Sequence, residues 1–144
     1  MSAPPQTQVV IDAAQRRTGA RSLRVTFNAV SAAVNLNDIK QTIVVLPNAN
    51  YVLRFAFRAQ EVRSASTPLV EVVGVMSGDA PPDVLGATAS IANGSSEWQN
   101  VEVKFTTRAA TEAVVVRLGR APCPDALCPL LGRIWFDDFE LVVR

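Results

Sequence analysis

The sequence contains no histidine among its 144 residues. Without imidazole, Ser-His-Asp and Cys-His nucleophilic centres, histidine-ligated zinc and histidine general-base catalysis are all excluded. An excess of basic residues is missing as well, because 14 Lys and Arg residues face 13 Asp and Glu residues, for a net charge of +1. A general nucleic-acid-binding protein needs a large basic excess. The composition therefore favours a protein that is not an enzyme and has no nucleic-acid partner.

Long apolar runs are missing too. No stretch approaches the roughly 18–20 apolar residues of a membrane-spanning helix, and residues 1–15 lack the basic start and apolar core of a signal peptide. We expect a protein without a membrane span, with any export signal outside this sequence. The length suits one domain, and no repeat or linker divides the chain. We predict a single domain over residues 1–144, with residues 1–7 as an extended lead-in, that belongs to a larger protein.

The sequence is rich in alternating apolar and polar residues. Tyr51, Leu53 and Phe55 fall on one side of an extended chain. Arg54 and Arg58 fall on the other side, which is typical of a half-buried strand. The predicted strands, separated by turn residues, are 8–12, 22–27, 41–46, 51–58, 69–76, 84–91, 101–105, 114–118 and 133–143. Many short strands with one apolar face predict an all-β fold, an antiparallel β-sandwich or jelly roll.

The two cysteines, Cys123 and Cys128, flank a short Pro-Asp-Ala-Leu loop. Two cysteines without histidine cannot complete a four-ligand zinc site, and their spacing differs from the Cys-x-x-Cys of redox enzymes. We predict a local disulfide between them, with two free thiols as the alternative. A disulfide implies an oxidising compartment, and therefore an extracytoplasmic or secreted protein.

Asp137 and Asp138 are adjacent within the most apolar predicted strand. Neighbouring strand residues point to opposite faces unless a bulge intervenes. The pair is therefore unsuited to flank one glycosidic bond, which needs two carboxylates roughly 5–9.5 Å apart across a shared cleft. Two roles stay open for these aspartates: structural hydrogen bonding or ion pairing, and ligation of a structural calcium ion.

Several segments resemble the galactose-binding-like jelly-roll superfamily, which includes carbohydrate-binding modules of bacterial glycoside hydrolases. Residues 19–25 are similar to its "G-x-x-SL-x-V" entry, and residues 41–55 to its "Q-x-V-x-V-x-P-G-x-x-Y-x-L-x-F" stretch. Residues 97–106 resemble its "W-x…F-x-T" segment, and residues 132–139 its closing "G-x-x-x-x-DD-V" strand. The resemblance implies a jelly roll that binds carbohydrate without catalysis, with calcium at the Asp137–Asp138 pair as the one cofactor to consider.

The sequence departs from that pattern in two places. Asn48 replaces the usual glycine, which a left-handed turn tolerates. Nothing matches the superfamily's "N-x-x-F-E" element, whose glutamate can help to hold calcium, so a calcium site here would lack one customary ligand.

The predicted ligand site combines polar side chains at outward strand positions. Arg54, Arg58 and Arg117 would donate to sugar hydroxyls or carboxylates from a trough on a concave sheet face, with Glu71 opposite them. Trp135 has the opposite parity to its apolar neighbours, so it would stack on a ligand or cover a strand edge. A solvated face of ion pairs is the alternative interpretation of these charges.

The sequence thus predicts a non-catalytic carbohydrate-binding module that prefers acidic sugars, because carboxylates pair with arginine in bidentate fashion. The alternative is a structural or interaction module that docks neighbouring domains of its parent protein and binds no sugar.

Overall fold

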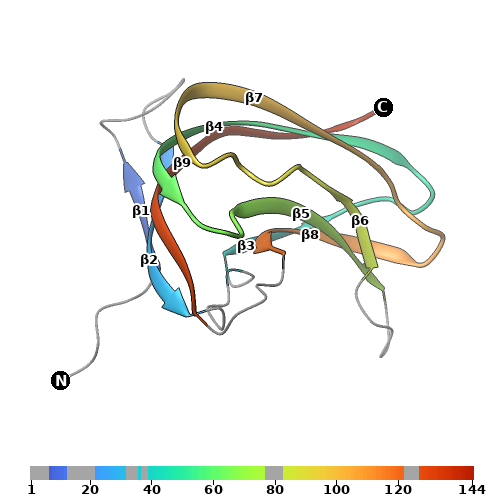
Figure 1. The fold of residues 1–144 in the computed structure, drawn as a ribbon. Helices are drawn as coiled ribbons and strands as arrows, with labels where there is room; N and C mark the ends of the chain where they lie inside the picture. The colour runs from blue at the N-terminus through green and yellow to red at the C-terminus, as the bar shows by residue number, and fades with distance from the viewer. Residues whose placement is uncertain (1–6, 13–21, 32–35, 37–38, 77–82, 122–126) are drawn as a thin grey trace.

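A computed structural model describes residues 7–12, 22–31, 36, 39–76, 83–121 and 127–144. This part of the chain forms nine strands and no α-helix (Figure 1). The strands are β1 (Thr7–Asp12), β2 (Ser22–Ser31), β3 (Lys40–Val44), β4 (Asn50–Arg63), β5 (Pro68–Met76), β6 (Asp83–Ala87), β7 (Gly94–Thr106), β8 (Thr111–Arg120) and β9 (Leu127–Val143). Each overlaps one predicted strand, so the all-β prediction is confirmed. Within these ranges, no helix has the length and apolar character that crossing a membrane requires.

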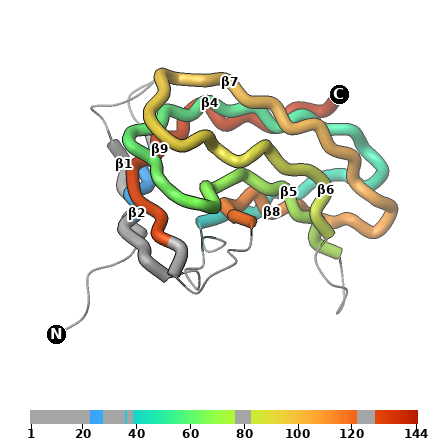
Figure 2. The backbone as a smooth tube through the Cα atoms, in the orientation of Figure 1, coloured from blue at the N-terminus to red at the C-terminus, as the bar shows by residue number. Residues whose placement is uncertain are grey.

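The strands form two antiparallel sheets. One has five strands in the order β1-β2-β9-β4-β7, and the other has four in the order β3-β8-β5-β6. The five-stranded sheet curves around the four-stranded one (Figures 1 and 2). This arrangement is the predicted antiparallel sandwich, and its apolar core lies between the sheets.

Strand β4 shows how alternation builds the core. Tyr51, Leu53 and Phe55 are buried and belong to the core cluster. Tyr51 stacks on Phe105 of β7 with ring centroids 5.6 Å apart, and its hydroxyl accepts a hydrogen bond from the Leu46 amide at 2.9 Å. The predicted core position of Tyr51 is therefore confirmed. Burying each such side chain contributes about 1.5–3 kcal/mol.

Two turns that cross between the sheets are joined to one another. Asn48, in the β3–β4 turn, has a φ of 50°, which is the left-handed conformation expected of this asparagine. The buried Thr107, in the β7–β8 turn, donates from its hydroxyl to the Leu46 carbonyl at 2.6 Å and accepts from the Ala49 amide at 2.9 Å. The Thr107 amide also donates to the Ala49 carbonyl. These bonds fix the two sheets relative to each other at this end.

Strands β2, β4, β7, β8 and β9 are several residues longer than predicted. Bulges interrupt the pairing of β2, β4, β7 and β9 and so disturb the alternation along them. β4 pairs with β9 through register shifts on both sides of residues 56–60. At one of them Gly132, with a φ of 117°, passes so close to β4 that an added Cβ would lie 2.6 Å from the Glu61 carbonyl oxygen. Only glycine fits this crossing. Strand β7 begins at Gly94 rather than at the predicted residue 101. Its first half was not predicted because it lies at the sheet edge and carries mostly exposed polar residues, which do not alternate with apolar ones.

Candidate functional site

The five predicted ligand-binding residues lie on two separate surfaces. Arg54 and Arg58 of β4 and Trp135 of β9 belong to the five-stranded sheet. Glu71 of β5 and Arg117 of β8 belong to the four-stranded sheet. All five have the outward parity expected of them, opposite to that of the core residues on their strands. Because the core separates the two outer faces, the structure does not bring these residues together in one trough.

The outer face of the five-stranded sheet holds a polar depression. Arg54 lies across from Glu102 of β7 and Glu140 of β9, and its Nε donates to Glu102 Oε1 at 2.9 Å. Both side chains of this pair are about half exposed. The depression has a volume of about 730 Å³, and its polar lining residues are Arg54, Asn100, Glu102, Asp138 and Glu140. It therefore presents one arginine against three carboxylates.

Arg58 and Trp135 lie next to this depression on the same face. Trp135 pairs with Arg58 on one side and with Arg24 of β2 on the other. The Arg58 guanidinium carbon lies 5.8 Å from the centre of the Trp135 ring, a cation–π contact, and one of its nitrogens lies 3.9 Å from a Glu97 carboxylate oxygen. Trp135 is only 5% exposed. The ring thus points outward as predicted but lies beneath other side chains, and a ligand on this face would meet Arg58 instead.

Trp98 is the second tryptophan of this face. It continues the outward positions of Asn100 and Glu102 along β7, and it is partly exposed. A register shift between β4 and β7 places residues 97 and 98 opposite Arg58. Its outward parity and partial exposure on the edge strand make Trp98 accessible to a ligand on this face.

The outer face of the four-stranded sheet is different in character. Glu71 and Arg117 approach to 3.7 Å and are each about one-fifth exposed. Lys40 and Thr42 of β3 pair with Arg117 and Val115, and most of the rest of this face is aliphatic, with Val73, Val75, Val84, Val115 and Val44, of which Val44 is 86% exposed. None of the four strands contains an aromatic residue. This face therefore offers an ion pair within a surface of valines, but its strands provide no ring on which a sugar could stack.

Asp137 and Asp138 lie at a bulge in β9. Ala56 pairs with Asp137 and Arg54 with Glu140, so one extra residue is accommodated on β9, and Asp138 takes a φ of 58°. The Asp137 carboxylate accepts a hydrogen bond from the Asp138 amide at 2.8 Å. Within the described ranges, no three His, Cys, Asp or Glu residues group as metal ligands would. This geometry supports the structural role of Asp137, and it turns Asp138 towards the depression.

The predicted disulfide between Cys123 and Cys128 falls outside what the structure describes. Cys123 is not among the described residues, and only the backbone of Cys128 is described, in β9.

Arg120 lies at the end of β8. Burial lowers the pKa of its guanidinium through desolvation.

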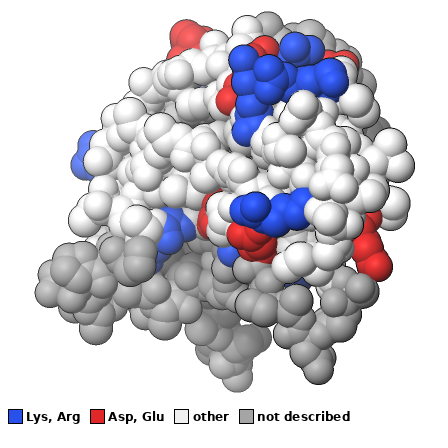
Figure 3. Space-filling view, turned by 90° about the vertical axis from the view of Figure 1, so that its right-hand side faces the viewer, with Lys and Arg blue, Asp and Glu red and all other residues white. Residues whose placement is uncertain are grey.

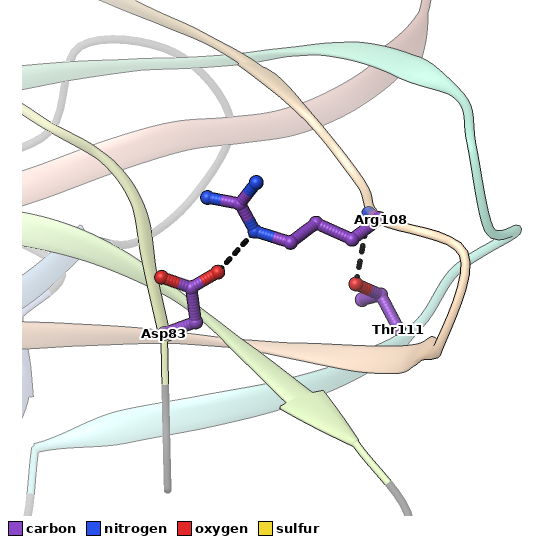
Figure 4. Close-up of polar contacts among 3 residues, drawn as sticks. All are labelled: Asp83, Arg108 and Thr111. Carbon is purple, nitrogen blue, oxygen red and sulfur yellow. Dashed lines mark hydrogen bonds and ion pairs between the residues drawn. The ribbon is translucent and has the colours of Figure 1, made fainter.

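Charges of both signs lie close together on the surface. On the face shown in Figure 3, the largest group of basic side chains is bordered by acidic ones, and most of the remaining described surface is uncharged. Figure 4 shows one such contact, in which Arg108 of the β7–β8 turn donates from Nε to Asp83 of β6. The Arg108 amide donates to the Thr111 hydroxyl at 2.9 Å, which orders the turn. Such mixed charge agrees with the net charge of +1.

Comparison with known structures identifies the fold. The CBM22-1 xylan-binding domain of Paenibacillus barcinonensis Xyn10C superposes with a TM-score of 0.61 at 19% identity, over 99% of this chain and 84% of that one. The CBM22-1–GH10 modules of Clostridium thermocellum xylanase Xyn10B, complexed with xylohexaose, give 0.62 at 11% identity over 96% and 25%. TmCBM61, in complex with β-1,4-galactotriose, gives 0.52 at 13% over 96% and 83%.

No protein-family model matches the sequence, and no curated protein matches it either. The structural neighbours nevertheless agree with one another, since they are carbohydrate-binding modules of several kinds. The chain therefore has the fold of these modules, and the jelly roll implied by the sequence resemblance is confirmed.

Proposed function

We propose that the protein is a non-catalytic carbohydrate-binding module that binds a neutral oligosaccharide or polysaccharide along the outer face of its five-stranded sheet. The observation that carries the proposal is the polar depression at Arg54, Asn100 and Glu102, beside the partly exposed Trp98. Guanidinium, amide and carboxylate groups form hydrogen bonds with sugar hydroxyls. An indole ring packs against the apolar side of a sugar ring. The site thus has both kinds of contact that a sugar needs.

The charge of the depression decides between neutral and acidic sugars. The depression holds one arginine, Arg54, which pairs with Glu102, and the carboxylates of Asp138 and Glu140 add two further negative charges to its lining. Like charges repel, so a sugar acid would bind poorly here. The acidic preference expected from the sequence assumed three arginines in one trough, and the structure places Arg117 on the other sheet. We therefore propose a neutral ligand instead.

The structural neighbours support the same class of function. One of them is a xylan-binding domain, and two others are complexes with xylohexaose and with β-1,4-galactotriose, which are uncharged oligosaccharides. One of them is joined to a GH10 module, and another forms part of a tandem pair. We accordingly propose that this chain is one module of a larger protein that acts outside the cytoplasm, with the disulfide between Cys123 and Cys128.

Isothermal titration calorimetry of the chain tests the proposal, with xylohexaose, β-1,4-galactotriose and an acidic oligogalacturonate as probes. Binding should be weak, because sugar hydroxyls exchange water bonds for protein bonds at small net gain. A neutral probe should bind more tightly than the acidic one. Arg54→Ala should weaken binding by roughly 10-fold, since it removes a charged hydrogen-bond donor.

The matched control is Arg63→Ala, which removes an exposed arginine at the far end of the same strand. It should leave the affinity unchanged. Equal losses from both variants would move the site away from the depression, and no binding of any probe would overturn the proposed function.

A docking module is the second candidate, because the valines of the four-stranded face form an apolar surface. Such a surface would pack against a neighbouring domain of the parent protein. Hydrogen exchange measured on the isolated chain and on a longer parent protein would distinguish the two. Protection of β3 and β6 only in the longer protein, with no glycan binding by either, would favour docking.

A further inference from the structure

A second opening lies at the edge of the sandwich, between β7 and the segment 88–93 that follows β6. Its volume is about 410 Å³, within the range of small-ligand sites. Phe55 and Phe57 of the five-stranded sheet and Val70 of the four-stranded sheet line its apolar interior. We call this opening the edge pocket. These three residues belong to the packed core, so they form the floor of the pocket.

The described residues that line the edge pocket include no charged side chain. Its polar groups are neutral hydroxyls and amides, from Thr88, Ser90, Asn93, Ser95, Ser96 and Gln99. This combination of apolar interior and neutral polar rim differs from the acidic depression on the outer face. It suits a ligand with many hydroxyls and no charge.

The hydrogen bonds around the rim show which groups a ligand would meet. Asn93 Oδ1 accepts from the Ser64 amide at 2.8 Å, which holds the side chain so that its NH₂ group is the part left to donate. Gln99 is exposed and carries both a donor and an acceptor. The Ser96 hydroxyl is buried in the pocket wall without a hydrogen-bond partner among the described residues. A buried hydroxyl without a partner costs free energy, and a hydroxyl-bearing ligand would supply one.

Strand β7 connects this pocket with the proposed sugar site. Gln99 and Val101 pair with Phe57 and Phe55 and line the edge pocket. The intervening Asn100 lines the depression on the opposite side of the strand. Because β7 is the edge strand of its sheet, one strand width separates the two sites and nothing in the sheet continues beyond it.

We propose that the edge pocket binds one sugar unit of the neutral glycan whose chain lies on the outer face, an inference that rests on the proposed function. Its apolar floor suits the apolar side of a sugar ring, and its hydroxyl and amide groups suit the sugar hydroxyls. The absence of charge among its described lining residues makes this contact insensitive to ionic strength. The protein would then hold the glycan on both sides of β7.

The test compares Ala92→Trp, which fills the mouth of the pocket with an uncharged ring, with Ala110→Trp, the same change at an exposed position of the β7–β8 turn. Calorimetry with xylohexaose or β-1,4-galactotriose, whichever the unaltered chain binds, should show a loss of about 10-fold for Ala92→Trp and none for Ala110→Trp. Melting temperatures of both variants check folding. Should Ala92→Trp fail to fold, Gln99→Ala replaces it, with a loss of a few-fold expected.

Side-chain amide resonances provide a direct readout, because the Gln99 and Asn93 NH₂ signals should shift as the glycan is added. The proposal is overturned if the glycan binds, Arg54→Ala weakens it, and neither the pocket variants nor the amide signals respond. Absence of any glycan binding overturns the proposed function and the pocket together.

Discussion

The two outer faces of the sandwich are built by the same alternation and differ in everything that a ligand would meet. The five-stranded face presents Arg54 and Glu102 as a half-exposed pair beside a polar depression. The four-stranded face presents Glu71 and Arg117 as a mostly covered pair among valines. Since alternation fixes only which side chains point outward, the chemistry of each face is free to vary. The proposal of sugar binding rests on the five-stranded face, and the alternative of docking rests on the four-stranded face.

The largest loss of stability is expected where β9 passes close to β4 within the five-stranded sheet. Gly132→Ala should lower the free energy of unfolding by about 3 kcal/mol or more, because a Cβ in this left-handed conformation would collide with the β4 backbone. Urea denaturation measures the loss. Gly94→Ala is the control: its φ is 107°, but an added Cβ meets nothing within 4 Å. Only the strain should remain there, at about 1 kcal/mol, and equal losses would show that the close approach is not important.

A smaller effect should follow from loosening the link between the two faces. Thr107→Val removes the hydroxyl that bonds the Leu46 carbonyl and the Ala49 amide, and it leaves both groups without that partner. We expect a loss of about 2 kcal/mol in the free energy of unfolding. The neighbouring Thr106→Val removes an exposed hydroxyl that donates to Asn50 at 2.7 Å. Its loss should stay near 0.5 kcal/mol, and a loss as large as that of Thr107→Val would contradict the argument.

The ion pairs on the two outer faces should differ in how much they contribute to stability. Arg117→Met leaves the Glu71 carboxylate within an aliphatic surface, and we expect it to destabilise the fold by about 1–2 kcal/mol. Arg54→Met leaves Glu102 half in water, so its effect should be about 0.5 kcal/mol or less. Thermal unfolding at low and high salt measures both. A larger loss for Arg54→Met would show that exposure does not control the strength of these pairs.

Much of this fold was predictable because its signals are local. Alternation identified all nine strands, and it placed Tyr51 inside and Arg54 outside. It could not assign the strands to sheets, because strand order depends on contacts between residues far apart in sequence. For this reason the prediction placed Arg117 and Arg54 in one trough, which is wrong because their strands belong to different sheets. The burial of Trp135 could not be predicted either, because strand alternation does not show which side chains cover an outward-pointing ring.

The bulge at Asp138 depends on the same long-range pairing. Two adjacent aspartates suggested opposite faces or a calcium site, and only the register between β4 and β9 shows the extra residue that redirects Asp138. The edge pocket has no sequence signal either, because its lining comes from both sheets and from the segment between β6 and β7.

The smallest expected effect concerns calcium and the acidic side of the five-stranded face. A cation bound only by the folded state would raise the melting temperature as its concentration rises. The Asp137 carboxylate already accepts the Asp138 amide, and the described residues around it do not group as metal ligands. We therefore expect the same melting temperature in millimolar calcium and in chelator. A rise in calcium that Asp137→Asn abolishes would establish a metal site, and magnesium at the same concentration would control for simple screening of Glu102, Asp138 and Glu140.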